Sequence, residues 1–261
     1  MRTSKIFITI LLGFSVLALF SCSMLSKKYE KRETIDYKLS AVNKTGIKLN
    51  NVSGKVSISR GDSASGITVH ADMIGYVKKK DLDKPLENMR VEVDSSASVI
   101  QIKSEFDKDK EWFHWDFKGR EINYRITVPP NIKVSVDNVN GEIELNGVNS
   151  EVEASTVNGT ISFDNLCGIK DLSTVNGKIS GTIDSVRNIK LETVNGSIDL
   201  GIAKTFSGSI KATVVNGRVS YENLTLSDPV DEKKSLRGYI GNRDNELSID
   251  AVNGKITLKG K

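Results

Sequence analysis

The tripeptide Val-Asn-Gly occurs six times in this chain of 261 residues, and its regular spacing constrains the fold more than any other feature. The six copies begin at Val139, Val157, Val175, Val194, Val215 and Val252. The intervals between them are 18, 18, 19, 21 and 37 residues, so the last interval contains either one degenerate repeat or a long loop. Such a period indicates supersecondary units that stack on one another.

Apolar and polar residues alternate on both sides of the motif, for example over residues 152–156 and 161–163. This period of two is typical of strands with one buried face, and Lys170 interrupts it once, which we interpret as a local turn. Asn-Gly between two such strands marks a hairpin or, because the motif recurs in tandem, the corner of a coil. We therefore predict an all-β fold, a single β-solenoid or flattened β-roll with rungs of about 18–21 residues.

The extent of the pattern predicts one domain over residues 35–261. The segment 47–58 has the register of the later units, with Ser53 in place of the asparagine. Residues 67–130 contain strands and polar loops but no Val-Asn-Gly, so we expect a less regular β segment there. The regular rungs should then fill residues 131–261.

The first residues have the pattern of an export signal. Residues 1–21 combine a charged start with a short apolar run, which is typical of a signal peptide and too short for a comfortable membrane span. The run ends in Leu-Phe-Ser-Cys, which resembles a bacterial lipobox, so we predict that Cys22 is lipidated and becomes the mature N-terminus. The alternative is an ordinary signal peptide, since Phe20 is bulkier than the usual lipobox residue. Residues 22–34 are polar and basic without a strand pattern, and we expect a solvated tether there.

Composition argues against several classes of function. The net charge of +4 falls to +2 when Arg2 and Lys5 leave with the signal, which does not indicate a nucleic-acid partner. The two histidines, His70 and His114, are far apart and have no Cys or His at metal-ligand spacing, so we expect no metal site and no cofactor. With Cys22 lipidated, Cys167 is a lone thiol that we interpret as a small buried residue. We predict that the protein is not an enzyme.

One aromatic cluster stands out, Trp-Phe-His-Trp-Asp-Phe at residues 112–117. Exposed aromatic side chains stack on sugars or anchor protein partners, which makes Trp112, His114 and Trp115 candidate binding residues. Alternatively, Phe113, Trp115 and Phe117 form one buried strand face that closes the end of the stack, and we favour this second interpretation.

Counting along each strand predicts how the motif is oriented. The asparagines fall in line with the buried side chains, so we expect them to stack at the corner and to hydrogen-bond along the stack, while the next glycine supplies an unusual φ. These residues are Asn140, Asn158, Asn176, Asn195, Asn216 and Asn253. The preceding valines point the other way and form an exposed stripe. We expect residues 67–128 of the same chain to cover this stripe; the alternative is a partner molecule.

Three segments together resemble a known family. They are "ITVPP", the tandem "VNGxIxL" units and the C-terminal "LRGYIGNRDNELSIDAVNGKITL", and they resemble the bacterial "putative adhesin" domain family over residues 35–261. The resemblance implies a β-solenoid, and members of that family are often exported or attached to membranes. It implies no catalytic residues, and it implies adhesion only weakly.

These observations lead to one functional hypothesis. We expect a non-enzymatic, lipid-anchored protein of the bacterial cell envelope whose surface binds a protein or a glycan, held to the membrane by its N-terminal lipid. The absence of an acidic run after Cys22 favours an outer-membrane or periplasm-facing location. The alternatives are an envelope-stress sensing or regulatory domain that acts through a membrane partner, and a structural spacer.

Overall fold

The computed structural model describes residues 28–62, 66–87, 89–106, 119–164, 166, 168–184 and 188–261. Over these ranges the fold is all-β, with seventeen strands, one short 3₁₀ helix and no α-helix. The elements are β1 (Lys28–Leu39), β2 (Gly46–Ser53), β3 (Val56–Arg60), β4 (Ile67–Lys78), η1 (Lys79–Asp81), β5 (Met89–Asp94), β6 (Val99–Phe106), β7 (Glu121–Val128), β8 (Lys133–Asn140), β9 (Ile143–Asn146), β10 (Val152–Asn158), β11 (Ile161–Asp164), β12 (Ile169–Ile183), β13 (Ile189–Ile202), β14 (Gly208–Glu222), β15 (Ser227–Glu232), β16 (Ser235–Ile240) and β17 (Glu246–Gly260). Within this described part, no helix is long and apolar enough to cross a membrane.

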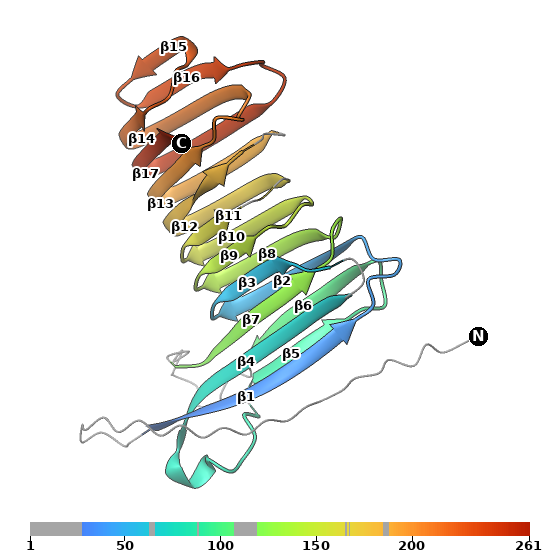
Figure 1. Cartoon of the computed structure of the whole chain (residues 1–261). Coiled ribbons are helices and arrows are strands. Elements are labelled where there is room, and N and C mark those ends of the chain that lie inside the picture. Colours follow the sequence, from blue (N-terminus) through green and yellow to red (C-terminus); the bar gives the residue numbers. More distant parts are fainter. Residues whose placement is uncertain are drawn as a thin grey trace.

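All seventeen strands belong to one sheet that curls around the core along the length of the molecule (Figure 1). Each repeat runs up to Val-Asn-Gly, bends there and continues, either as two strands such as β10 and β11 or as one long strand such as β12. We call this unit a rung, and the parts before and after the corner its first and second strands. First strands pair in parallel with first strands, as β10 does with β8 and β12, and second strands pair with second strands, as β11 does with β9 and β12. Equivalent residues of neighbouring rungs therefore lie side by side, as Asn158 does with Asn140 and Asn176.

The corners depend on glycine mainly because neighbouring backbones approach closely. A Cβ atom at Gly177 would lie far inside contact distance of the carbonyl oxygen of Gly159 in the next rung. Gly141, Gly217 and Gly254 have positive φ values of 137°, 153° and 159°, but the φ values of Gly159 and Gly177 lie outside the range from +20° to +160° that side chains rarely adopt. The expectation that glycine supplies an unusual φ is therefore wrong for part of the column. There the missing side chain, and not the dihedral angle, makes the corner possible.

The order of the rungs differs from their order in the chain. The rung of β2 and β3 lies between β6 and β7 on one side and β8 and β9 on the other. At the other end, β17 pairs in parallel with both β13 and β14 and so lies between them. The 37-residue interval before Val252 contains neither a degenerate rung nor a simple loop. It contains the strands β15 and β16, which pair with each other, and β16 pairs antiparallel with β14.

The N-terminal part is antiparallel. β1 pairs with β4 from Lys28 opposite Lys78 to Leu39 opposite Ile67. The prediction of a structureless tether up to residue 34 is therefore wrong for residues 28–34. The alternation is hidden there because Lys31, on the inward face, is buried and forms an ion pair of 3.3 Å with Glu33 where apolar residues would be expected.

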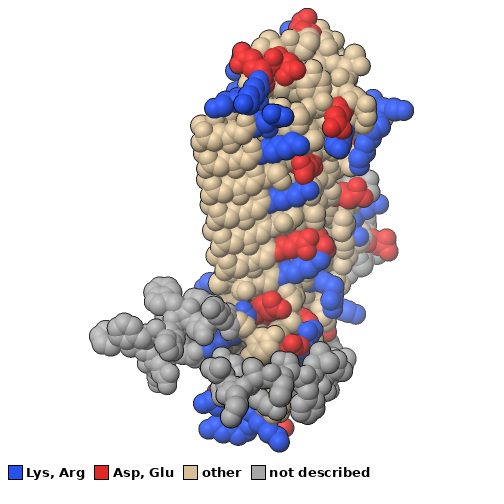
Figure 2. All heavy atoms as spheres, turned by 90° about the vertical axis from the view of Figure 1, so that its left-hand side faces the viewer, with Lys and Arg blue, Asp and Glu red and all other residues tan. Residues whose placement is uncertain are grey.

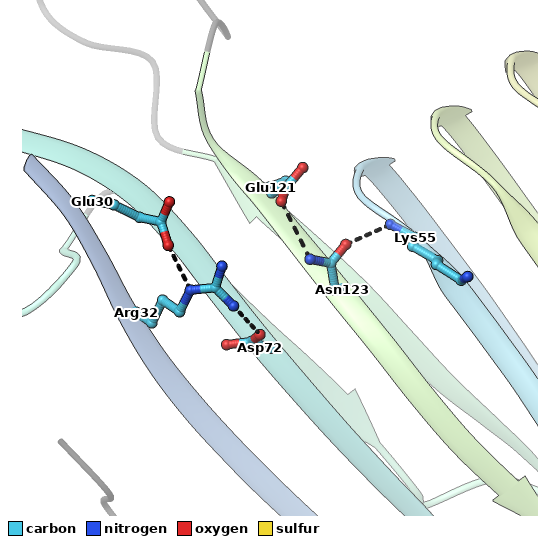
Figure 3. Close-up of polar contacts among 6 residues, drawn as sticks. All are labelled: Glu30, Arg32, Lys55, Asp72, Glu121 and Asn123. Carbon is cyan, nitrogen blue, oxygen red and sulfur yellow. Dashed lines mark hydrogen bonds and ion pairs between the residues drawn. The ribbon is translucent and has the colours of Figure 1, made fainter. Parts of the chain in front are cut away.

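Polar side chains also hold β1 to β4 on the outer face. The Nε atom of Arg32 donates to Oε1 of Glu30 at 2.6 Å, and its Nη1 lies 3.4 Å from Oδ2 of Asp72 on β4 (Figure 3). The hydrogen bond to Glu30 raises the pKa of Arg32. Exposed ion pairs of this kind stabilise little individually, so they serve here mainly to keep a charged edge strand in register.

Lys170 interrupts the alternation of apolar and polar residues in β12. Lys170 is not in a turn: Val152 pairs with Ile169 and Glu153 with Asp171, so Lys170 is the extra residue of a β-bulge.

A buried polar cluster joins β2, β6 and β7. In it, Oγ of Ser104 lies 2.7 Å from both Oδ1 of Asn51 and the Tyr124 hydroxyl.

Candidate binding face

The asparagines of the six motifs form one hydrogen-bonded ladder along the corner. In five hydrogen bonds of 2.8–3.0 Å, the Nδ2 of one asparagine donates to the Oδ1 of the asparagine before it in the ladder. The order along the ladder is Asn140, Asn158, Asn176, Asn195, Asn253 and Asn216. The counting along the strands placed them in line with buried side chains, but the backbone bends at the corner and leaves all six exposed. Each amide still has one N–H and one oxygen lone pair that the ladder does not use.

The valines next to these asparagines form a second, apolar column on the outside of the corner. The exposed fraction is 39% for Val139, Val157 and Val175, 40% for Val194, 41% for Val252 and 57% for Val215. The expectation that residues 67–128 cover this column is therefore wrong for the described part of that segment. We call the two columns together, the six valines and the six asparagines of the motifs, the Val-Asn face.

A shallow hollow of about 420 Å³ follows the valine column of this face across several rungs. Valines from Val157 to Val252 line it together with short hydroxyl side chains such as Ser155, Ser173 and Thr213. Glu192 and Asp250 lie at the same hollow. The lining of the hollow therefore combines valine methyl groups with hydroxyl and carboxylate side chains.

Figure 2 shows that this side of the molecule is largely uncharged along its length, with charged side chains gathered in a column beside it. Several of those charges form ion pairs with one another. Lys55 forms ion pairs with Glu142 and Glu144, and Lys178 forms one of 2.7 Å with Asp199. The hydrogen bond between Lys55 and Glu144 raises the pKa of the lysine and lowers that of the glutamate, so both remain charged at neutral pH.

The side chains beneath the face hold its backbone in place, and the sequence analysis did not single them out. Thr174 is buried, and its Oγ1 donates to the carbonyl oxygen of Gly159 in the next rung at 3.1 Å. Thr156 makes the same contact with Gly141 at 3.4 Å. The signal was present in the sequence, because threonine precedes three of the motifs; the third, Thr193, is also buried, but its Oγ1 has no hydrogen-bond partner among the described residues.

At the corner of the rung formed by β2 and β3, the neighbouring side chain comes from Asn123 on β7. Oδ1 of Asn123 accepts a hydrogen bond from the backbone N–H of Lys55 at 2.6 Å, and its Nδ2 donates to Oε1 of Glu121 at 3.3 Å (Figure 3). The ladder itself ends close by, where Nδ2 of Asn140 donates to the carbonyl oxygen of Val52 at 3.5 Å. Asn123 thus satisfies a corner amide of the first rung.

The structure does not place the other predicted site residues. Cys22, Trp112, His114 and Trp115 lie outside the described residues. His70 lies on β4, where its Nδ1 is 2.7 Å from Oδ1 of Asp36 on β1. In the part of the chain that the structure describes, no group of three or more His, Cys, Asp or Glu residues is placed to hold a metal ion.

Comparisons with known proteins give distant structural neighbours. No family model matches the chain, and no curated protein sequence matches it. A "putative cell adhesion protein" from Clostridium sporogenes aligns at 15% identity and a TM-score of 0.48, over 90% of this chain and all of the other (100%). A "putative adhesin" from Bacteroides fragilis aligns at 13% identity and a TM-score of 0.31, over 88% of this chain and 97% of the other. A "putative lipid binding protein" from Parabacteroides distasonis aligns at 13% identity and a TM-score of 0.31, over 88% of this chain and 96% of the other. Likenesses this distant carry no argument about what the present chain binds.

Proposed function

We propose that this chain is a lipid-anchored, non-enzymatic protein of the bacterial cell envelope. In this proposal it is a β-solenoid of the adhesin-domain type that binds a protein or a glycan through the Val-Asn face. The observation that carries the proposal is the exposed column of six valines, which no described part of the chain covers. A continuous apolar stripe on a protein surface usually meets another surface.

The chemistry of the face supports binding over catalysis. Its groups are valine methyls, asparagine amides and a few hydroxyls, while several of the charged residues beside it are paired with one another. The asparagines repeat at the strand spacing of about 4.8 Å and leave one donor and one acceptor each for a ligand. The hydrogen bonds of the ladder and the buried threonines keep these groups in place, which lowers the entropic cost of binding.

The test is to place charge on the face without disturbing the stack. The double variant Val175→Lys with Val194→Lys should lose most binding of the purified protein to isolated cell envelopes, because two ammonium groups would have to be desolvated in the contact. The matched control is Ser162→Lys with Ser180→Lys, which adds the same charge to the second strands of two neighbouring rungs. Thermal unfolding should be nearly unchanged in both variants. Undiminished envelope binding by the valine variant would overturn the proposed face.

The anchor is tested separately. Cys22→Ala should release the protein from membranes or leave an unprocessed precursor, and the wild type should incorporate a labelled fatty acid. Unchanged membrane fractionation of the variant, together with no labelling of the wild type, would refute the anchor while leaving the binding face open to its own test.

A further inference from the structure

The chain enters the fold beside an exposed group of lysines. Lys78, Lys79, Lys80 and Lys84 surround η1, and all four are exposed. Lys28, the first residue of β1, is the pairing partner of Lys78. Figure 1 shows η1 at the lower end of the molecule, opposite β15 and β16, and Figure 2 shows Lys and Arg side chains at this same lower end. We call residues 76–84 the basic end.

The basic end is electropositive although it contains acidic residues. Residues 78–84 contain four lysines and two aspartates, a net charge of +2. One aspartate, Asp81, is held by Lys84 at 2.9 Å, and this contact together with the neighbouring lysines lowers the pKa of Asp81. Lys78, Lys79 and Lys80 follow one another in the sequence at the tip of the segment. Their positive charge is therefore concentrated at the very end of the molecule.

Apolar groups lie among these lysines. Tyr76 is 47% exposed, and Leu82 is half-buried at the turn after η1. A hollow of about 430 Å³ lies here, lined among others by Tyr76, Lys78, Lys80 and Arg120, with Asp81 and Glu87 as its acidic members. An aromatic side chain among lysines is typical of surfaces that lie in the headgroup region of a membrane.

We propose that the basic end docks on anionic phospholipid headgroups, so that the stack stands away from the membrane and the Val-Asn face stays accessible along its side. This inference rests on the proposed lipid anchor. Six peptide units separate Cys22 from Lys28, which fixes Lys28 within roughly 20 Å of the lipidated residue. Because Lys28 pairs with Lys78, the anchor brings the basic end to the headgroups, where several lysines are attracted to negative lipid.

A photo-crosslinking experiment tests this docking. The protein is expressed from the whole sequence, so that its own N-terminus can be processed, with a photoreactive phenylalanine analogue in place of Tyr76, and is reconstituted in two kinds of vesicle. One contains phosphatidylcholine alone, and the other contains equal parts of phosphatidylcholine and phosphatidylglycerol. We expect about tenfold more lipid adduct in the second kind, and about 0.5 M salt should abolish the difference, because salt screens exposed charges. Equal adduct in both kinds of vesicle would mean proximity without recognition and would overturn the proposal.

Charge variants identify the residues responsible. Lys78→Gln, Lys79→Gln and Lys80→Gln together should reduce the adduct in the anionic vesicles to the level seen with phosphatidylcholine. The matched control, Lys204→Gln, Lys211→Gln and Lys255→Gln, removes three exposed lysines near β13, β14 and β17 and should leave the adduct unchanged. An equal loss in both variants, or no loss in the first, would overturn the docking. The mass of the N-terminal peptide tests the anchor independently. If Cys22 carries no acyl chains, the anchor is refuted. If the yield of lipid adduct does not depend on lipid charge, only the docking is refuted.

Discussion

Nδ2 of Asn253 donates a hydrogen bond of 2.9 Å to Oδ1 of Asn195, although 58 positions separate the two residues in the chain. The bond exists because the last strand, β17, lies between β13 and β14 and continues the ladder from one to the other. In the chain, β14 is followed by β15 and β16, and the C-terminal strand β17 then lies between β13 and β14. The C-terminal residues are therefore part of the interior of the stack and not of its end.

This placement predicts the pattern of amide hydrogen exchange. β17 is paired along both edges, whereas β15 is paired along one edge and is exposed throughout. The amides of Ile249 and Ile256 should exchange at least about a thousandfold more slowly than those of Val230 and Asp231, a difference of roughly 4 kcal/mol in opening free energy. Mass spectrometry of exchanged peptides measures this. Fast exchange across the whole of β17 would contradict its position between β13 and β14.

The ladder predicts different effects for its inner and terminal asparagines. Asn176 donates to Asn158 and accepts from Asn195, while Asn216 only donates to Asn253 within the ladder. At about 0.5–1.5 kcal/mol for each hydrogen bond, Asn176→Ala should lower the free energy of unfolding by about 1–2 kcal/mol and Asn216→Ala by about half as much. Urea denaturation at constant m value measures both. Equal losses would show that the ladder bonds do not determine the stability of the corner.

A methyl group should have a strong steric effect at the corner glycine Gly177 and a weak one at Gly201, which lies away from the corner. A methyl group at Gly177 meets the backbone carbonyl of Gly159, which cannot move without displacing its rung. At Gly201 the methyl group meets the side chain of Lys261, which can rotate away. We expect Gly177→Ala to cost about 3 kcal/mol or more and Gly201→Ala less than about 1 kcal/mol, measured by thermal unfolding. Similar values for the two variants would rule out close approach as the reason for glycine at the corner.

The buried phenol of Tyr124 predicts a loss of stability at alkaline pH. Burial raises the pKa of Tyr124, and its hydroxyl lies 2.7 Å from Oγ of Ser104. An ordinary tyrosine has a pKa of about 10, so the unfolded chain releases this proton first as the pH rises. Its contribution to stability is complete below about pH 10 and is lost above it, at up to about 1.4 kcal/mol per pH unit.

The variant Tyr124→Phe isolates this contribution. It should lose some stability at neutral pH, because Ser104 loses a buried partner, but its free energy of unfolding should fall less steeply than that of the wild type between about pH 10 and 11. Urea denaturation at several pH values gives both slopes. Parallel pH profiles for the two proteins would refute the assignment.

Much of the local organisation could be read from short-range pattern. A period of two decides which side chains of a strand face the core, so the valines of the motifs were expected outside, and all six are exposed. The equal intervals of 18 residues between the first three motifs put equivalent residues at equivalent positions, which is why Asn158 lies beside Asn140 and Asn176. The exposure of these asparagines could not be read in the same way, because counting by two assumes a straight strand and the chain bends at this point.

The sequence by itself determined the all-β class, the register of the rungs and the outward side of the valines, since each of these depends on residues that are close together in the chain. Only the tertiary structure decided that β17 lies between β13 and β14, and that residues 28–34 form a strand against β4. The physical reason is the same for both. Backbone edges of equivalent rungs are interchangeable, so local sequence does not decide which rungs β17 pairs with. An edge strand with an internal ion pair such as Lys31–Glu33 shows no apolar pattern. In both cases the choice of pairing partner depends on contacts between distant segments.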